Sequence, residues 1–251
     1  MTGRMLHRVD KIQRTSPEPR RRPQPEEGSL SILFEDETVV VLDKPAGVVV
    51  HPTYKNTSGT LLNALLWRYR DRDLIQPGIL TRLDKDTSGV VVVALTPALH
   101  AAMQRDMSAG RVKKEYLAAV RGVPDPPCGR ISLPLGRSAE DRRVVVVRDD
   151  GAPCETLYEV VGAISGDEIS MSVVRCELVT GRTHQIRVHL AARGWPIVGD
   201  GVYGEKSARI PRQALHAWRV TFPHPVTRAA ITVTAPIPPD LESLLRRVAG
   251  P

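Results

Sequence analysis

The sequence contains few aromatic residues and few cysteines. Phe, Trp and Tyr make up 4% of the 251 residues, which is too little for the broad base-stacking platforms of proteins that bind single-stranded nucleic acid. The three cysteines, Cys128, Cys154 and Cys176, are odd in number and widely spaced. They do not have the closely spaced pairs of a zinc site. They are typical of reduced, mostly buried thiols in a cytoplasmic protein.

Long apolar runs are also missing. No stretch approaches 18 uncharged apolar residues, so the sequence predicts no membrane span. The N-terminus carries Arg4, Arg8 and Lys11 but lacks the apolar core of a secretory signal. We therefore expect a cytoplasmic protein without a membrane partner.

The charge balance is basic. Lys and Arg number 35 against 28 acidic residues, a net charge of +7, and 41% of the residues are hydrophobic. The hydrophobic fraction is enough for one large core or two small ones. A basic surface favours a polyanionic partner, most commonly nucleic acid, although a solvated basic surface without a ligand is also consistent with this charge.

Residues 1–28 differ from the rest of the chain. They include four prolines, the run Arg20 to Arg22, and seven basic against four acidic residues. Such a segment cannot bury enough apolar surface to offset the entropy of ordering. We predict a disordered tail over residues 1–29, which either adds non-specific affinity for nucleic acid or is idle, and a folded domain over residues 30–251.

Patterning after Leu30 predicts many strands with a few helices between them. Expected strands lie at residues 31–34, 38–42, 47–50, 90–95, 113–120, 143–148, 155–161, 169–179, 214–221 and 230–234. Expected helices lie at residues 60–70, 97–109 and 183–193. The absence of a regular strand–helix–strand rhythm favours an α+β fold with a mixed, largely antiparallel sheet flanked by helices.

One charged pair precedes the most apolar strand. Arg82 and Asp84 lie two residues apart before the valine run, and at a strand period of two they would point to the same side. Charges at the end of a buried strand are costly unless they are paired or used. The ordinary interpretation is a turn closed by Gly89.

The predicted helix over 183–193, with Thr183 as its N-cap, places an arginine inside its apolar stripe. Arg187 either extends outward to solvent or is buried against a carboxylate. A buried guanidinium prefers a bidentate acidic partner, and Asp84 is the candidate, although a purely structural salt bridge is an alternative. His184 and His189 are five residues apart, so they do not form a helical metal-binding pair.

Tyr116 lies in a strand with aliphatic neighbours. It is either a core tyrosine whose hydroxyl is satisfied at the sheet edge, or a ring that stacks on a planar ligand.

Six segments, in this order, resemble the RluA family of RNA pseudouridine synthases over roughly residues 30–236. They are residues 32–52, 82–89 (Arg-Leu-Asp-Lys-Asp-Thr-Ser-Gly), 113–118, 181–187 (Gly-Arg-Thr-His-Gln-Ile-Arg), 196–200, and 213–217 with 222–225. The resemblance implies the pseudouridine synthase catalytic fold. It also implies isomerisation of uridines to pseudouridine in ribosomal or transfer RNA, by a monomer that needs neither cofactor nor metal.

The resemblance also assigns roles to residues. Asp84 would be the catalytic carboxylate at the uridine ribose, with Arg187 as its cationic partner and Tyr116 packed against the uracil. Arg82 would fill the gap left by the flipped-out nucleotide. Three residues of the arginine-helix segment would bind RNA: Arg182, His184 and Gln185.

Two features depart from the family pattern. Position 81 is threonine, where members more often carry histidine, and we expect activity to survive this change. Many relatives carry a small RNA-binding domain before the first segment, whereas the residues before Leu30 are too few and too polar to form one.

Two other functions stay open at this point. A non-catalytic RNA-binding protein would have no need of the combined Arg82, Asp84, Tyr116 and Arg187. A glycosidase that used Asp84 and Asp86 would need two carboxylates on opposite sides of one bond, which residues two apart in a turn do not provide.

Overall fold

A computed structural model describes residues 23–53, 56–165 and 170–249. Within these residues it contains twelve strands and four helices. The strands are β1 (Ser31–Glu35), β2 (Val39–Lys44), β3 (Gly78–Ile79), β4 (Ser88–Ala94), β5 (Lys113–Arg121), β6 (Cys128–Ser132), β7 (Leu135–Arg137), β8 (Val145–Val147), β9 (Glu155–Ser165), β10 (Ser170–Leu178), β11 (Leu215–Pro223) and β12 (Ala230–Thr234). The helices are α1 (Leu61–Arg68), α2 (Pro97–Ser108), α3 (Gln185–Ala192) and α4 (Pro239–Ala249).

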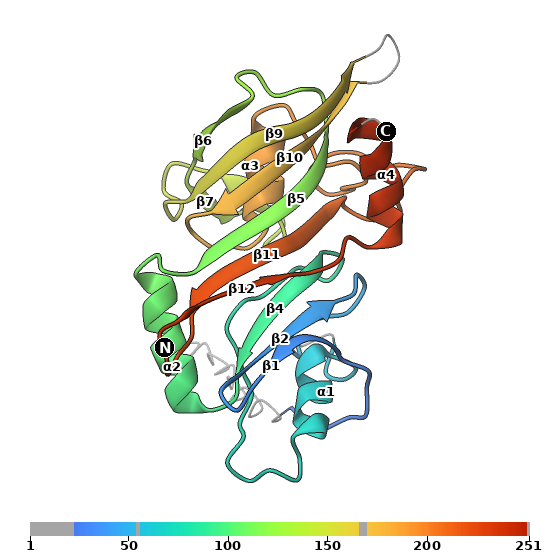
Figure 1. Cartoon of the computed structure of the whole chain (residues 1–251). Helices are drawn as coiled ribbons and strands as arrows, with labels where there is room; N and C mark the ends of the chain where they lie inside the picture. Colours follow the sequence, from blue (N-terminus) through green and yellow to red (C-terminus); the bar gives the residue numbers. More distant parts are fainter. Residues whose placement is uncertain (1–22, 54–55, 166–169, 250–251) are drawn as a thin grey trace, which may run out of the picture.

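One sheet of ten strands runs through the described chain (Figure 1). Its order is β1-β2-β4-β11-β5-β10-β9-β6, with β3 also paired to β4 and β12 to β11. The pairing of β4 with β11 is parallel, and the other pairings are antiparallel. β7 and β8 form a separate small hairpin. The expected α+β fold with a mixed, largely antiparallel sheet is confirmed.

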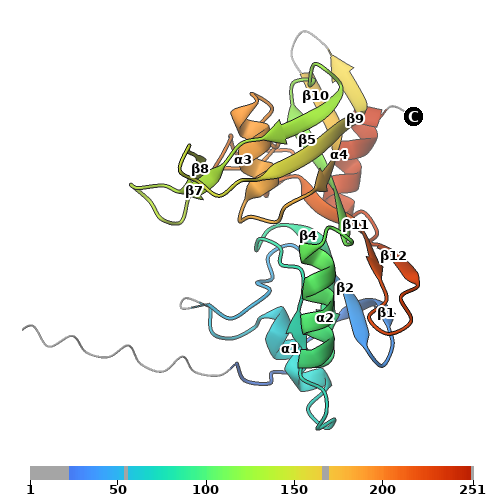
Figure 2. The same cartoon turned by 90° about the vertical axis from the view of Figure 1, so that its left-hand side faces the viewer.

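Hydrophobic clusters pack against the sheet at both of its ends. β4 is buried along its whole length, and its valines alternate between two clusters on the two faces of the sheet. A third and larger cluster combines β5 and β10 with α3 and α4. Figure 2 shows α1 and α2 at the end of the molecule with β1 and β2, and α3 and α4 at the other end.

Two helices, α1 and α2, begin at threonine side-chain caps. The Thr60 side chain accepts a hydrogen bond from the backbone of Asn63 at the start of α1. Thr96 does the same for Leu99 at the start of α2, where Pro97 occupies the first turn. The sequence did not predict α4, whose first turn carries Asp240 and Glu242.

Two predicted boundaries are wrong. Residues 47–50 form a loop, because the carbonyls of Val49 and Val50 accept the first free N–H groups of α1 instead of pairing in the sheet. Order begins before Leu30: the Glu26 carboxylate accepts a hydrogen bond from Gly59, and its backbone N–H donates to Asn63. The remainder of the predicted tail, residues 1–22, lies outside the described residues.

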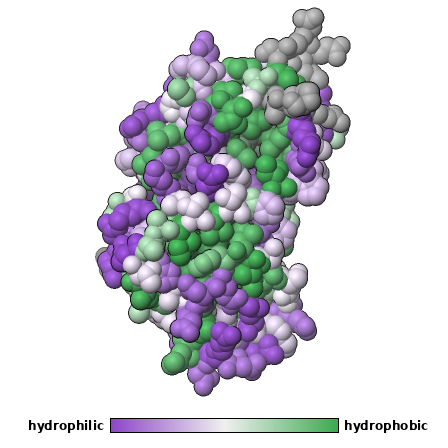
Figure 3. All heavy atoms as spheres, in the orientation of Figure 1, coloured by the Kyte–Doolittle hydropathy of each residue, from purple (hydrophilic) through white to green (hydrophobic). Residues whose placement is uncertain are grey.

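None of the helices in the described part of the chain is long and apolar enough to cross a membrane. On the face shown in Figure 3, hydrophobic residues gather in patches within a largely hydrophilic surface. The isolated exposed aliphatic side chains include Leu74 and Val226, and scattered residues of this kind are usual on protein surfaces.

The junction of β4 and β11 requires glycine at position 89. Gly89 has φ +111°, and a Cβ atom there would lie 2.1 Å from the carbonyl oxygen of Ala217 on the paired strand. Glycine alone accepts this backbone angle without strain, and neither backbone can retreat without opening the parallel pair.

Gly89→Ala should therefore lower the free energy of unfolding by several kcal/mol. Gly110→Ala is the matched control, because Gly110 also has positive φ but its Cβ would meet open space. The control should cost only about 1–2 kcal/mol, the backbone term alone. Urea unfolding of both variants measures the difference, and equal losses would show that the clash with Ala217 is relieved by local movement.

Candidate active site

Asp84 lies in the loop that joins β3 to β4. Its side chain is 24% exposed. The expectation that Arg82 and Asp84 sit in a strand is wrong, because β4 begins only at Ser88. The turn interpretation is correct for this segment, since the Thr87 N–H donates to the Asp84 carbonyl.

A buried lysine holds this loop against β2. Lys44 is 0% exposed, and its ammonium group donates to the carbonyls of Pro45, Val48 and Lys85 at 2.8 Å each. Burial lowers the pKa of Lys44 to about 8, with the charge of Asp86 acting in the opposite direction. One side chain thus fixes the backbone beside Asp84.

Two residues before β11 hold the same loop from its other side. Arg212 donates to the Asp86 carbonyl at 3.2 Å, and the Gln213 side chain donates to Thr87 at 3.3 Å. Arg212 itself is fixed by two bonds to Asp240. The loop is thereby tied both to β2 and to the segment that leads into β11.

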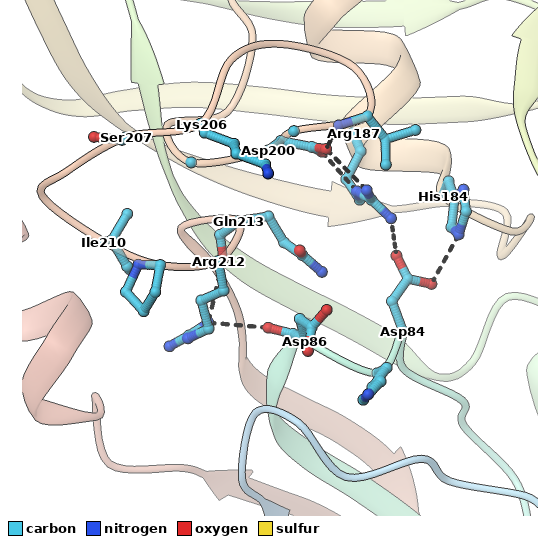
Figure 4. A pocket seen from close by; sticks show the side chains of 15 residues that line it. Asp84, Asp86, His184, Arg187, Asp200, Lys206, Ser207, Ile210, Arg212 and Gln213 are labelled. Carbon is cyan, nitrogen blue, oxygen red and sulfur yellow. Dashed lines mark hydrogen bonds and ion pairs between the residues drawn. The ribbon is translucent and has the colours of Figure 1, made fainter. Parts of the chain in front are cut away.

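Arg187 on α3 joins Asp84 to a second carboxylate (Figure 4). Its NH1 atom lies 2.9 Å from Asp84 Oδ2, so the predicted pairing is present. The bidentate partner, however, is Asp200, which Nε and NH2 contact at 2.6 and 2.9 Å. The expectation that Asp84 is the bidentate partner is therefore wrong. Of the two alternatives for Arg187, extension to solvent or burial against a carboxylate, the structure has the buried one, at 5% exposure.

Arg187 remains charged in this setting. Burial alone would lower its pKa, but the hydrogen bonds and charges of Asp200 and Asp84 raise the pKa above its usual value. Burial alone would likewise raise the pKa of Asp200, but Arg187 and the N–H groups of Val202 and Tyr203 bring it below the usual value. Asp200 therefore binds the Nε–NH2 edge of the guanidinium and leaves NH1 for Asp84.

His184 lies beside Asp84 with an unusual backbone. It is the N-cap of α3, so the prediction of Thr183 is wrong, and it has φ 56° in the left-handed region. Its Nε2 atom is 3.8 Å from Asp84 Oδ1, and its Nδ1 atom is 2.7 Å from the Tyr203 hydroxyl. A non-glycine residue in this region indicates strain that the surroundings maintain.

A cavity of about 640 Å³ opens next to Asp84. Tyr116 contributes to its wall, together with the apolar side chains of Leu83, Leu178, Ile186 and Leu215. Tyr116 is 7% exposed. Burial, and secondarily the charge of Asp84, raise its pKa. Its hydroxyl has no hydrogen-bond partner among the described residues, unlike a core tyrosine satisfied at a sheet edge.

Basic side chains surround the mouth of this cavity. Arg82 and Arg182 are both exposed and line it. Within the described part of the chain, Arg82 forms no ion pair. Lys114 and Arg137 also line the cavity. They were not predicted, because they lie on β5 and β7, which are far apart in the sequence.

Gln185 and Thr81 both have structural roles in this fold. Gln185 was predicted to bind RNA, but it is 2% exposed, and its amide donates to Glu155 and Thr156 while accepting from Thr180 and Arg182. It therefore fixes the start of α3, and the four hydrogen bonds of its amide argue against the predicted contact with RNA. Thr81, at the position where the family resemblance led us to expect histidine, accepts a hydrogen bond from the Val92 N–H and so attaches the loop to β4.

Sequence reasoning missed Asp200 and Tyr203. Asp200 occurs in a segment that contributed to the family resemblance but received no role. A role for it could have been inferred, because a buried arginine needs more than one hydrogen-bond acceptor. Tyr203 had no signal, because its contact with His184 depends on the turn from Asp200 to Gly204.

No metal site is formed by the described residues: they contain no group of three or more His, Cys, Asp or Glu side chains placed to hold an ion. His189 is fully buried and bonds to Thr156 and the Leu133 carbonyl. Cys154 and Cys176 are buried free thiols, as expected, whereas Cys128 is exposed.

A profile of the RNA pseudouridylate synthase family matches residues 38–192. The chain belongs to this family. The ribosomal large subunit pseudouridine synthase D of Nitrosomonas europaea is 41% identical over 229 residues, which cover 87% of this chain and 65% of the relative. The protein of the same name from Xanthomonas campestris is 42% identical over 88% of this chain and 70% of the relative. The chain thus spans about two thirds of the length of these relatives.

Solved structures agree on the fold. Human RNA pseudouridylate synthase domain containing 1 has a TM-score of 0.68 at 28% identity, over 90% of this chain and 99% of that one. Human RNA pseudouridylate synthase domain containing 4 has a TM-score of 0.69 at 22% identity, over 86% and 92%. The expected pseudouridine synthase fold and RluA-type membership are confirmed, and the non-catalytic alternative is not favoured.

Arg187→Ala should lower the free energy of unfolding by about 3–5 kcal/mol, because it leaves the 1% exposed Asp200 carboxylate unpaired. Turnover should fall as well, since Asp84 loses its cationic partner. Arg175→Ala is the control: Arg175 is 41% exposed, its 3.9 Å pair with Glu115 is long and Glu159 is 50% exposed, so the change should cost less than about 1 kcal/mol. Equal melting temperatures for the two variants would contradict the role of the buried pair.

Proposed function

We propose that this chain converts uridine to pseudouridine in RNA, with Asp84 as the catalytic carboxylate. The observation that carries the proposal is the position of Asp84: it lies at the wall of the cavity that contains Tyr116, with Arg187 at 2.9 Å. Family membership supports this reaction over glycoside hydrolysis.

The reaction requires one bond to break and another to form on the same base. Asp84 acts at the ribose while the C1′–N1 bond breaks, and the electron pair of that bond stays on the uracil. The uracil turns in the cavity, bonds to C1′ through C5 and then loses the C5 proton. N1 takes up a proton in place of the one lost from C5, so uridine and pseudouridine have the same composition and the reaction needs no external oxidant or reductant.

The cavity supports the handling of a flipped-out base. Its apolar wall suits the faces of a uracil ring, and Tyr116 offers an aromatic surface for packing. A base inside an RNA helix must leave the stack to reach Asp84. Arg82 is exposed beside the cavity and has no ion pair within the described residues, so it is available to occupy the vacated position.

We propose large-subunit ribosomal RNA as the first substrate to test, since the two bacterial relatives above carry that name; transfer RNA is the second. Exposed Arg182 at the cavity mouth suits the RNA phosphates. We also propose a monomer in a reducing compartment such as the cytoplasm, where the buried thiols of Cys154 and Cys176 would stay free.

Asp84→Asn should abolish pseudouridine formation and leave RNA affinity within a few fold, because the amide has the same shape but cannot act as nucleophile or base. Asp86→Asn is the matched control and should remain active. The measurement is tritium release from C5-labelled uridine in unmodified transcripts. Activity of the purified Asp84→Asn protein above background would remove Asp84 from this role. Loss of activity in both variants, with free uracil released by the wild type, would favour a glycosidase.

Arg82→Ala should slow the reaction most on structured RNA, where the enzyme must supply a few kcal/mol of unstacking free energy. The penalty on an unpaired oligonucleotide should be smaller. Turnover on a stem-loop and on a matching single strand, with a melting curve of each protein, makes the comparison. An equal loss on both RNAs with a lower melting temperature would instead mean that Arg82 is structural.

A further inference from the structure

Tyr203 contacts both side chains that face Asp84. It lies in the turn that begins at Asp200. The Arg187 guanidinium sits over its ring at 5.0 Å from the centroid, and the His184 ring meets it edge-on at 5.6 Å. The residue is thus placed to control how both partners approach the carboxylate.

The hydrogen bonds of the Tyr203 hydroxyl determine where its proton points. The backbone N–H of Val145 can only donate, and it lies 2.9 Å from the hydroxyl oxygen, which therefore accepts. The hydroxyl proton needs an acceptor, and within the described residues the one within reach is His184 Nδ1 at 2.7 Å. With Nδ1 as acceptor, the proton of the neutral imidazole must be on Nε2.

The neutral form of His184 is the relevant one. Burial lowers its pKa; Asp84 and Asp200 act to raise it, while Arg187 and Arg137 act to lower it, and the net shift is downward. The ring is therefore uncharged at neutral pH, with one N–H donor.

That donor has no partner in the described protein. The 3.8 Å between Nε2 and Asp84 Oδ1 is too long for a hydrogen bond. The His184 side chain is 20% exposed. It lines both the cavity with Tyr116 and a second cavity of about 520 Å³, which Asp84 also lines (Figure 4). A left-handed backbone holds the ring in this place.

We propose that Tyr203 is a positioning residue that fixes His184 with its proton on Nε2, and that this N–H donates to an oxygen of the target uracil. The inference rests on the proposed function. When the C1′–N1 bond breaks, its electron pair spreads over N1 and the carbonyl oxygens of the uracil. A fixed donor beside the ribose carboxylate stabilises that charge. His184 gives up no proton, so it stays neutral through the step.

The tautomer can be measured without any activity. In the ¹⁵N spectrum of the imidazole groups, His184 should show a protonated Nε2 and an unprotonated Nδ1 at neutral pH; the variant His184→Gln assigns the signal. In Tyr203→Phe, which loses the donor to Nδ1, the signals should move toward a mixture of tautomers. A protonated Nδ1 in the wild type would overturn the proposal, whatever the enzyme does.

Two substitutions at position 184 separate donation from backbone fit. Asn tolerates the left-handed region better than Gln, but its amide reaches only the Nδ1 position, whereas the amide of Gln reaches the Nε2 position. On the RNA that shows Asp84-dependent activity, His184→Asn should lose about 100-fold in single-turnover rate, with RNA affinity unchanged, and His184→Gln should retain clearly more. If His184→Asn reacted as fast as His184→Gln, donation from the Nε2 position would not matter, and residue 184 would serve only the fold.

A double-mutant comparison tests the role of Tyr203. Tyr203→Phe should lower the rate about tenfold in the wild type, and by less than about twofold in the His184→Asn background, where no tautomer remains to be set. Its effect on the melting temperature should be the same in both backgrounds. Equal rate losses in both backgrounds would overturn the proposal. Because the spectra do not depend on turnover, failure of the proposed function would leave a different pattern: a correct tautomer with no Asp84-dependent activity.

Discussion

The structure of the site depends on one guanidinium shared between two carboxylates. Arg187 is buried on α3, a position that is unfavourable without compensating charge. Asp200 provides that compensation through two bonds at 2.6 and 2.9 Å, and the third bond reaches Asp84. Because Asp200 stabilises the arginine independently of Asp84, Asp84 is free to be more exposed and to act on a substrate.

The same carboxylate needs a rigid loop, and buried polar groups provide it. Lys44 bonds to Lys85 from one side, and Arg212 bonds to Asp86 from the other. These side chains come from the segments around β2 and β11, which lie on either side of β4 in the sheet. The loop is therefore part of the packing of the two ends of the molecule, and it cannot be repositioned by a local change alone.

Patterns that depend on neighbours in sequence were predictable here, and those that depend on distant partners were not. Thr96 followed by Pro97 identifies the start of α2 because capping is a local hydrogen bond. The apolar residues 47–50 read as a strand, but α1 and Lys44 take their carbonyls. The pairing of Arg187 with Asp84 followed from the cost of a buried charge. Its larger partner, Asp200, required knowledge of the turn after α3.

The backbone of His184 shows why the geometry of such a site cannot be predicted from sequence patterns alone. A helix normally begins with a side-chain cap, and Thr183 offers one, yet the chain enters α3 through a strained residue with no capping bond. The strain is sustained because Gln185 secures the first turn through four hydrogen bonds of its own. With the helix start held in this way, residue 184 is released from capping and its ring is directed toward Asp84. Stability at one residue thus permits an unfavourable conformation at its neighbour, where the chemistry takes place.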